Sequence, residues 1–285
     1  LNGEHPEPVE ISLFTGANRI FEICATPVPD AGAFRTVLTL HDTTREKLAE
    51  GMRADFVANV SHELRSPLAS LIGFVETLRG PAKDDREAQE KFLGIMQSEA
   101  QRMARLIDDL LSLSRVEVDE HIQPRDQVSL PSLLQQLVDV MRVRANKKAM
   151  ALYLNLPANL PDVAGDEDQL IQVFQNLIDN AVKYGRPNTD INIEISVLDR
   201  VPGTSESGVS VSIKDQGDGI SAENLSRLTE RFYRVDKARS RELGGTGLGL
   251  AIVKHIISRH RGWLEIDSEE SIGSTFTVTL PILKA

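Results

Sequence analysis

Apolar residues recur every three or four positions along two long stretches in the first half of the chain, which is the spacing of an amphipathic helix. A turn at residues 80–85 separates the two stretches, so the predicted helices form a hairpin. The first helix, residues 43–79, carries an apolar stripe made of Phe56, Val60, Leu64, Leu68, Leu71, Val75 and Leu78. The second carries a heptad stripe with one acidic member, made of Phe92, Met96, Glu99, Met103, Leu106, Leu110 and Leu113.

The hairpin predicted over residues 46–122 is too small to enclose a core of its own. Because it leaves its apolar stripes exposed, the pattern predicts that two chains pair into a four-helix bundle, and therefore a homodimer. The alternative is a single hairpin that packs on the rest of its own chain.

Residues 1–45 contain three short segments with strand-like alternation or apolar runs, at 9–13, 19–25 and 34–41, separated by glycine and proline. Three such strands bury too little surface to form a core, so they need neighbours or a partner chain. The sequence also begins with Leu1 rather than methionine, which suggests a piece of a longer protein. A disordered or cut arm is the alternative.

After a polar linker at residues 123–126, helices and strands alternate, which predicts a mixed α/β domain over residues 123–285. Asp166, with Gln169 three residues later, predicts the start of a helix, and Gly185 predicts its end as a C′ residue. The other predicted helices cover residues 131–146, 222–230 and 248–260. The predicted strands cover residues 151–156, 191–198, 209–214, 263–267 and 275–280.

Composition narrows the class of protein. The length of 285 residues suggests about two domains with a fragment of a third, and 41% hydrophobic with 26% charged residues is ordinary for a globular protein. The formal charge of −10 argues against a general nucleic-acid binder. The single cysteine, Cys24, excludes an internal disulfide and fits a reducing cytosol. The sequence has no apolar run of about 18 residues, so we expect any membrane contact to come from a segment absent from it.

His62 lies in the first predicted helix, within the sequence SHELRSPL at residues 61–68. It is about 200° around the helix from the two nearest stripe residues, so it points away from the stripe and toward solvent. Glu63 is adjacent, Ser66 lies one turn further on, and Pro67 can kink the helix. A lone helical histidine is ordinarily a plain surface residue, so its meaning depends on these neighbours and on the segments downstream.

The predicted helix at residues 166–184 gathers Asn176, Asn180 and Lys183 on one face, about 130° from its apolar face. Asparagine is a poor helix former, so two of them at positions i and i+4 suggest a purpose. Amide oxygens are hard ligands that suit Mg²⁺, and a lysine adds positive charge for a phosphate. By itself, an NxxxN helix is a weak signal.

Two glycine-rich segments follow. DQGDG at residues 215–219 comes directly after a strand, where Gly217 and Gly219 let the backbone approach a flat ligand and Asp215 can accept a hydrogen bond from an exocyclic amine. An ordinary turn is the alternative. GGTGLG at residues 244–249 opens the last helix, and such a helix N-terminus can bind an anion such as triphosphate. This segment is neither a Walker A loop nor a Rossmann fingerprint, because no GK[ST] follows and no βαβ unit is opened.

Residues 231–241 carry five positive side chains and no strong signal for a helix or strand. This composition fits a flexible lid over phosphates, with Phe232 and Tyr233 as its hydrophobic hinge. A solvated basic loop is the alternative. Residues 273–276 predict a tight turn into the last strand.

SHELRSPL resembles the phospho-acceptor box of sensor histidine kinases, and the downstream segments resemble, in order, the N, G1, F, G2 and G3 boxes of their ATP-binding domains. The resemblance covers roughly residues 46–285, and residues 232–255 look especially similar to the phosphate-regulon sensor kinases. LHDTTREKLAE, at residues 40–50, resembles the exit from a PAS sensor domain into a signalling helix. The implied fold is multidomain. It comprises a partial PAS-like β segment at 1–45, an all-α dimerisation and phosphotransfer domain at 46–122, and an α/β-sandwich ATP-binding domain of the Bergerat type at 123–285.

The resemblance implies a protein-histidine kinase that uses ATP and Mg²⁺. His62 would accept the phosphoryl group and pass it to an aspartate of a response-regulator receiver domain. Glu63 would accept or orient the other ring proton, and Ser66 would orient a water molecule for dephosphorylating the regulator. Phosphate-starvation signalling is a role that the resemblance suggests. The full-length protein is expected at the cytoplasmic face of the inner membrane, with the present chain soluble and cytoplasmic.

In the ATP-binding domain, the family pattern assigns Mg²⁺ to Asn180, the adenine to Asp215, packing beside the base to Tyr184, and the phosphates to Lys183 and Arg234. The full set of expected nucleotide-binding residues is Asn176, Asn180, Lys183, Tyr184, Asp215, Gly217, Gly219, Arg234, Gly245, Thr246, Gly247, Leu248, Gly249 and Thr275.

The sequence departs from the family pattern at two positions, and two other classes of protein are alternatives to the kinase. Ser66 and Gly185 stand where the family usually has threonine and serine, and both changes are conservative for ATP use. An ATPase of the chaperone or topoisomerase sort would share the boxes at Asn180 and Asp215. Such an enzyme uses a helix carboxylate where this chain has Asn176, and no acceptor histidine is expected there. A nucleotide-binding scaffold without transfer activity is the other class, and the intact acceptor and nucleotide residues argue against it.

Overall fold

The computed structural model describes residues 7–15, 17–30, 33–157 and 159–283. The chain divides into two compact units, Leu1–Ile72 and Gly73–Ala285. The boundary between the units falls inside the first long helix, α1 (Thr44–Arg79). Within the described residues, no helix is long and apolar enough to cross a lipid bilayer.

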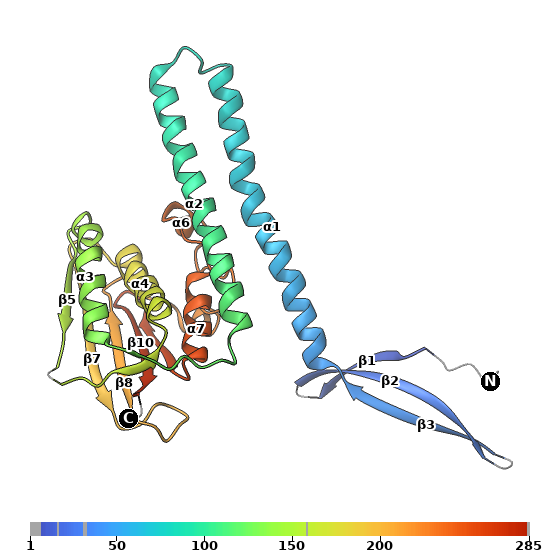
Figure 1. The fold of residues 1–285 in the computed structure, drawn as a ribbon. Helices are drawn as coiled ribbons and strands as arrows, with labels where there is room; N and C mark the ends of the chain where they lie inside the picture. Colours follow the sequence, from blue (N-terminus) through green and yellow to red (C-terminus); the bar gives the residue numbers. More distant parts are fainter. Residues whose placement is uncertain (1–6, 16, 31–32, 158, 284–285) are drawn as a thin grey trace. The chain divides into compact units, whose positions relative to one another are not determined.

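The first unit contains an antiparallel sheet whose strands follow one another in chain order (Figure 1). The strands are β1 (Val9–Thr15), β2 (Ala17–Asp30) and β3 (Ala33–Asp42), so the three predicted strands are confirmed. The sheet leaves large apolar side chains exposed, namely Val9, Leu13, Val37, Leu38 and Leu40. That exposure is expected of three strands that are too few to enclose a core. Membership of the PAS family stays a prediction.

Helix α1 is tied to this sheet at its first turn. The backbone of Ile20, on β2, accepts a hydrogen bond from the N–H of Thr43 and donates one to the hydroxyl oxygen of Thr44, both at 2.9 Å. The carboxylate of Asp42 accepts a hydrogen bond from the N–H of Thr44 at 3.1 Å, which satisfies an amide that the helix leaves open at its start. The helix then continues through Pro67, so the helix predicted over residues 43–79 is confirmed.

The second unit begins with the last residues of α1, the turn and α2 (Arg86–Val118). Asp85 caps α2 by accepting a hydrogen bond from an amide of its first turn at 3.0 Å. The rings of Phe74 and Phe92 stack across the turn with their centroids 5.3 Å apart. Both aromatic residues therefore help to close the predicted turn at residues 80–85.

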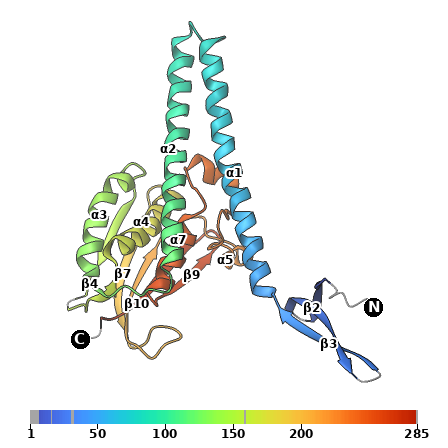
Figure 2. The same cartoon turned by 45° about the vertical axis from the view of Figure 1, so that its right-hand side comes forward.

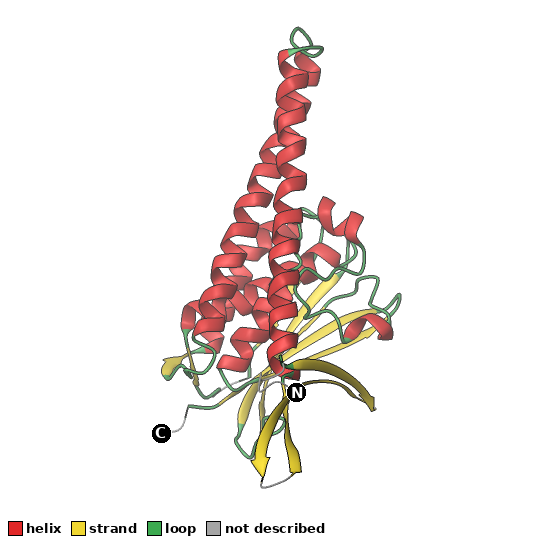
Figure 3. Ribbon diagram, turned by 90° about the vertical axis from the view of Figure 1, so that its right-hand side faces the viewer, coloured by secondary structure: helices red, strands yellow, loops and turns green. Residues whose placement is uncertain are grey.

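The rest of the second unit is an α/β sandwich. The order of the five-stranded sheet is β5-β7-β8-β10-β9, and only β5 and β7 run parallel. Helices α3, α4 and α7 lie on one face of this sheet, and α7 also packs beside the C-terminal part of α2 (Figures 2 and 3). The elements are β4 (Asp126–Val128), α3 (Leu130–Asn146), β5 (Ala151–Asn155), β6 (Val163–Gly165), α4 (Glu167–Tyr184), β7 (Asp190–Leu198), β8 (Gly208–Lys214), α5 (Ala222–Leu225), α6 (Lys237–Glu242), α7 (Gly249–Arg259), β9 (Trp263–Glu269) and β10 (Gly273–Pro281).

The side chains of β7 alternate between buried and more exposed positions, so one face of the sheet is buried and the other faces solvent. Ile191, Ile193 and Ile195 are buried, whereas Glu194 is exposed. Because successive side chains of a strand point to opposite faces, the apolar set of β7 contributes to the core and the polar set faces solvent.

Four short elements differ from the prediction. The helix expected over residues 222–230 stops at Leu225, because the N–H groups of Arg227, Leu228 and Glu230 each bond the carbonyl three residues earlier, which makes tight turns instead of an α-helix. Helix α6 was not predicted, although Asp236 caps it by accepting hydrogen bonds from two amides of its first turn at 2.9 and 3.1 Å. The paired strands β4 and β6 were also missed, because three residues are too few to show an alternation.

Gly185 ends α4 as predicted, but the reason for a glycine is different. Its φ of −62° and ψ of 149° are extended, whereas a C′ glycine is left-handed. A Cβ at this position would lie 2.4 Å from the methyl carbon of Met150 and 2.5 Å from the carbonyl oxygen of Ala181. Glycine is therefore needed for space, and that crowding comes from the packing of β5 and α4.

His260, at the end of α7, is completely buried and joins two elements. Its Nδ1 lies 2.7 Å from the carbonyl oxygen of Ile256, and its Nε2 accepts a hydrogen bond from the N–H of Asp166 at 3.0 Å. Nδ1 therefore carries the proton of a neutral ring. Burial lowers the pKa of His260 from its ordinary value of 6.5.

We expect the free energy of unfolding of this domain to fall as the pH drops below about 6.5. Because the pKa of His260 is lower in the folded chain than in the unfolded chain, the unfolded chain binds the proton more readily. The stabilisation is therefore complete above the unfolded pKa and is lost progressively below it. Urea unfolding between about pH 8 and pH 5, followed by the fluorescence of the single tryptophan, Trp263, measures the effect.

The variant His260→Gln supplies the control. It leaves a buried hydrogen bond unmade and should be less stable at pH 8 by about 1–3 kcal/mol. Its stability should also depend less on pH than that of the wild type. Equal pH dependence in the two proteins would show that other groups control the loss of stability.

Candidate functional site

His62 is exposed on α1, as its position relative to the apolar stripe predicts. Val60 and Leu64, on the stripe, are partly buried, whereas Ser66 is exposed like His62. Glu63 is partly buried beside the histidine. The structure therefore presents the ring of His62 to solvent, with a carboxylate next to it and a hydroxyl one helical turn away.

A cavity of about 450 Å³ lies in the second unit, among α4, the ends of β8 and β10, residues 228–249 and the middle of α2. This volume falls within the range of ligand-binding pockets. All but two of the expected nucleotide-binding residues line it. They are Asn176, Asn180, Lys183, Tyr184, Asp215, Gly217, Gly219, Arg234, Gly245, Thr246, Gly247 and Gly249.

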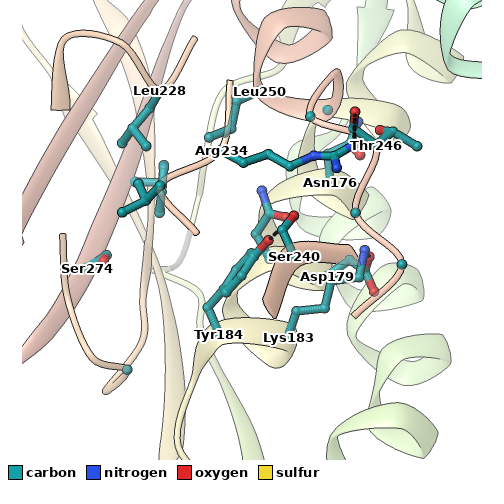
Figure 4. A pocket seen from close by; sticks show the side chains of 18 of the residues that line it. Asn176, Asp179, Lys183, Tyr184, Leu228, Arg234, Ser240, Thr246, Leu250 and Ser274 are labelled. Carbon is teal, nitrogen blue, oxygen red and sulfur yellow. Dashed lines mark hydrogen bonds and ion pairs between the residues drawn. The ribbon is translucent and has the colours of Figure 1, made fainter. Parts of the chain in front are cut away.

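The polar face of α4 forms one wall of the cavity (Figure 4). Helix α4 buries its other face in the core, so Asn176, Asn180 and Lys183 project together into the open space. The Nζ of Lys183 pairs with the carboxylate of Asp179 at 2.6 Å, and Arg144 of α3 pairs with the same carboxylate at 2.8 Å. The lysine expected to meet phosphates is therefore held by an acidic neighbour that the sequence did not single out.

Asp215 is buried at the end of β8, with only 5% of its surface exposed. Its Oδ1 accepts hydrogen bonds from the N–H of Gly217 at 2.8 Å and from the N–H of Ser274 at 3.3 Å. Burial raises the pKa of Asp215, and these two backbone bonds oppose the rise. The carboxyl is therefore fixed in orientation by the backbone, as a group that recognises one edge of a flat ligand must be.

Gly219 is in the left-handed region with a φ of 67°, and a Cβ there would lie 2.0 Å from the carbonyl oxygen of Glu269. Glycine is therefore required both by the backbone conformation and by the close approach of the β9–β10 turn. The DQGDG segment is held against this turn, so its shape depends on a pair of strands far along the sequence.

The glycine-rich loop at residues 244–249 is fixed through Thr246, which is nearly buried. The carbonyl oxygen of Thr246 accepts a hydrogen bond from Arg234 at 2.7 Å, and its hydroxyl accepts one from the N–H of Leu248 at 3.3 Å. The same hydroxyl donates to the carboxylate of Asp109, on α2, at 2.6 Å. Arg234, expected to meet phosphates, thus bonds the loop itself in this arrangement.

Leu248 and Thr275 do not line the cavity, so their expected role in nucleotide binding stays a prediction from the sequence. Leu248 is completely buried, because the residue that opens α7 turns into the core. Thr275 pairs with Lys214 and Asp267 in the sheet, and its side chain points to the face opposite the cavity. Its neighbours in the strand, Ser274 and Phe276, line the cavity instead.

Helix α6 covers the part of the cavity beside Tyr184. The hydroxyls of Tyr184 and Ser240 point toward each other at 3.3 Å (Figure 4), and Ser240 is buried. Arg239 of α6 pairs with Asp218 at 2.6 Å, and Arg186 pairs with the same carboxylate at 3.0 Å. The hydrogen bonds from both arginines lower the pKa of Asp218.

Tyr233 is anchored in place. Its hydroxyl donates to the side-chain oxygen of Asn224, and the guanidinium of Arg227 lies 4.3 Å from the centre of its ring. Phe232 is in the left-handed region, with a φ of 63°, and donates its N–H to the carbonyl of Gly247 at 2.8 Å. The two residues of the predicted hinge are therefore held by these contacts, and a lid over residues 231–241 stays a prediction.

The sequence prediction missed further cavity residues, because their own residue types and spacing match no nucleotide-binding pattern. Examples are Arg105, Asp108 and Asp109 of α2, Arg144 of α3, Gln172, Gln175 and Asp179 of α4, Ser240 of α6, and Ser274 and Phe276 of β10. The α2 residues were considered only as part of a heptad pattern. A heptad shows which face of a helix is apolar and does not show which other domain the polar face meets.

The cavity can hold a Mg²⁺ ion together with a polyphosphate. Among the described residues, no cluster of three or more His, Cys, Asp or Glu side chains could hold a metal ion by itself. The amide oxygens of Asn176 and Asn180 offer hard ligands, and Mg²⁺ commonly takes one or two protein ligands and completes its coordination with phosphates and waters. The residues present therefore fit a metal that arrives with its nucleotide.

Two family models match the chain. The His Kinase A (phospho-acceptor) domain matches residues 52–118, and the Histidine kinase-, DNA gyrase B-, and HSP90-like ATPase matches residues 165–284. These matches contain His62 and most of the cavity residues, respectively. A helical phospho-acceptor segment and an α/β ATP-binding domain are thus both present, as the sequence predicted.

Curated relatives and solved structures agree with this result. The chain is 36% identical over 249 residues to the sensor histidine kinase WalK of Bacillus subtilis (strain 168), which is 86% of this chain and 39% of that protein. It is 37% identical over 245 residues to the sensor-like histidine kinase SenX3 of Mycolicibacterium smegmatis, which is 86% of this chain and 62% of that protein. The chain therefore spans less than two thirds of the length of these relatives.

Among solved structures, the Acinetobacter baumannii histidine kinase AdeS matches with a TM-score of 0.60 at 25% identity, over 78% of this chain and 98% of that one. Full-length ShkA in complex with AMPPNP matches with a TM-score of 0.58 at 25% identity, over 81% of this chain and 46% of that one.

We expect Asn180→Ala and Asp215→Ala each to weaken the binding of Mg·ATP analogues. The first variant removes an expected metal ligand and the second a fixed carboxyl, and each loss is expected to cost about 1–3 kcal/mol, which is roughly a fivefold to 150-fold loss of affinity. Titration calorimetry measures the change. Asn155→Ala, at an exposed position of β5, is the matched control and should bind normally. Normal binding by either cavity variant would show that the nucleotide lies elsewhere.

Proposed function

Because this chain belongs to the two-component sensor histidine kinases, we propose that it transfers the γ-phosphoryl group of ATP to His62 and then to an aspartate of a response-regulator receiver domain. The observation that carries the proposal is the single cavity that gathers all but two of the expected nucleotide-binding residues. The exposed His62, inside the match to the phospho-acceptor domain, supplies the acceptor.

The nucleotide enters as Mg·ATP. Asn180 would hold the Mg²⁺, which would supply positive charge to the phosphates and act as a Lewis acid. Asp215 receives the exocyclic amine of adenine, and Tyr184 packs beside the base. Lys183 and Arg234 stabilise phosphate charge after exchanging their present partners, the Asp179 carboxylate and the Thr246 carbonyl.

In the transfer step, an unprotonated ring nitrogen of His62 attacks the γ-phosphorus in line with the bond to the ADP leaving group. A nitrogen–phosphorus bond forms as the phosphorus–oxygen bond to ADP breaks. Glu63, adjacent in the helix, accepts or orients the proton on the other ring nitrogen. Most of the acceleration comes from positioning and charge, because phosphoryl transfer leaves little covalent work for the protein.

The organisation around this reaction follows from the same family. The proposed domains are a PAS-like segment at residues 1–45, a dimerisation and phosphotransfer domain at 46–122, and a catalytic domain at 123–285. Two copies pair through the second domain as a homodimer, which recognises the receiver domain of its regulator. The whole protein works at the cytoplasmic face of the inner membrane and is also a phosphatase of the phosphorylated regulator. A role in phosphate starvation stays a prediction from the sequence.

A chaperone- or topoisomerase-type ATPase is disfavoured by the composition of the α4 face. Such enzymes carry a water-activating carboxylate at the position of Asn176. The side-chain oxygen of Asn176 lies close to Gly249, so a Cβ added to Gly249 would be 3.1 Å from it. The nearby carboxylate of Asp179 is neutralised by Lys183 and Arg144. At the position of the catalytic carboxylate of those enzymes, the α4 face therefore offers an amide instead.

We expect incubation with γ-labelled Mg·ATP to label His62. The label should be lost in acid and stable in base, because a phosphoramidate behaves in this way and a phosphoester does not. His62→Ala should remove the label, whereas His255→Ala, with the same change at another histidine, should retain it. Acid-stable label, or label retained in His62→Ala, would contradict the proposal.

We expect Glu63→Ala and Ser66→Ala to affect opposite reactions. Glu63 can take the imidazole proton, so its loss should remove most labelling of His62. Ser66 carries no charge but can align a water molecule, so its loss should spare labelling and reduce dephosphorylation of the regulator. Both rates can be measured with the purified cognate regulator. Equal loss of both activities in both variants would indicate that the residues only maintain the helix.

A further inference from the structure

Three side chains of α2 line the nucleotide cavity, and one of them, Asp109, bonds the glycine-rich loop. Asp109, partly buried, accepts a hydrogen bond from the hydroxyl of Thr246 at 2.6 Å. Thr246 belongs to the glycine-rich loop, and both residues line the cavity. A helix of the phospho-acceptor segment therefore holds the loop that is expected to surround the triphosphate.

The contact between Asp109 and Thr246 is part of a longer seam between α2 and the ATP-binding domain. The hydroxyl of Ser112 donates to the side chain of Gln172 on α4 at 2.8 Å. Glu117 pairs with Arg231, and Arg259 donates to the backbone carbonyl of Asp119 at 3.1 Å. Of these contacts, the one at Asp109 has its partner in the glycine-rich loop, so it is the contact that a nucleotide can disturb.

The charges around Asp109 indicate whether a bound nucleotide would strengthen or weaken its contact with Thr246. The charged groups that act on Asp109 are Lys183 from α4, and Arg105 and Asp108 from α2 itself. Lys183 is already shared with Asp179. The triphosphate of Mg·ATP keeps a net negative charge, so it would face a partly buried carboxylate and would compete with that carboxylate for Lys183 and for the Thr246 hydroxyl.

We propose that Asp109 is a positioning residue that latches the glycine-rich loop to α2, and that the latch and bound Mg·ATP exclude each other. Nucleotide binding then releases the loop from α2 and frees the catalytic domain to approach an acceptor histidine. Because coupling between two contacts is reciprocal, the Asp109–Thr246 latch lowers the affinity for nucleotide by the factor by which nucleotide weakens the latch. The inference rests on the proposed function for its consequence, but the antagonism itself concerns only binding.

The test is the variant Asp109→Asn in the full chain, which keeps the size of the side chain and an acceptor oxygen and removes the charge. Its affinity for Mg·ADP and for a non-hydrolysable Mg·ATP analogue, measured by calorimetry, should rise by about fivefold or more, the lower end of typical coupling between sites. Glu90→Gln is the control. It removes one carboxylate charge from an exposed position of the same helix that does not line the cavity, and should change the affinity less than about twofold.

Hydrogen exchange supplies a second readout, which compares the wild-type chain with the variant. Saturating nucleotide should increase exchange of the α2 amides around Asp109 in the wild-type chain and change it little in Asp109→Asn. Unchanged or weaker binding by Asp109→Asn would overturn the latch, and weaker binding would indicate that the carboxylate ligates Mg²⁺. An equal gain in Glu90→Gln would overturn it as well, since the effect would then follow from the net charge alone. Failure to label His62 would contradict the proposed function and leave these binding results unaffected.

Discussion

The placement of α4 is the constraint on which the nucleotide site depends. The helix must bury one face in the core and present Asn176, Asn180 and Lys183 to the cavity, so its rotation about its own axis has to be fixed. Its N-terminus is held by Asp166, whose side chain accepts from the third helical amide at 3.2 Å and whose own N–H is bound by His260. At the other end, Lys148 donates to two carbonyls of the last turn at 2.8 and 2.7 Å.

These two clamps come from elements distant in sequence, α7 at one end and the loop after α3 at the other. A lysine at the C-terminus of a helix also complements the negative end of its dipole. The site is therefore built on a helix whose ends are satisfied, and its polar face is positioned by the core beneath it. Loss of the contacts at either end of α4 would first change the positions of the side chains that α4 presents to the cavity.

The cations around the cavity are bound to protein partners that they can exchange. Lys183 and Arg239 pair with partly exposed carboxylates, and Arg234 bonds a backbone carbonyl. Exposed ion pairs contribute only about 0–1 kcal/mol each, so a triphosphate can replace these partners at little cost. The buried Asp215, by contrast, is fixed by two backbone amides and has no such freedom. The end of the cavity at Asp215 is thus rigid, and the end lined by the cations is adaptable.

The sequence by itself determined the features that repeat along the chain. Helical periodicity located α1, α2 and α4 and predicted that His62 faces solvent. The order of polar and glycine-rich segments identified the family. The tertiary structure decided which side chains meet. It placed Leu248 in the core and Thr275 on the far face of β10, required Gly185 for space and not for its dihedral angles, and joined Asp109 to Thr246 across the sequence. Periodicity is a local property of a helix or strand. The neighbours of a side chain are set by how distant elements pack, and no local pattern encodes them.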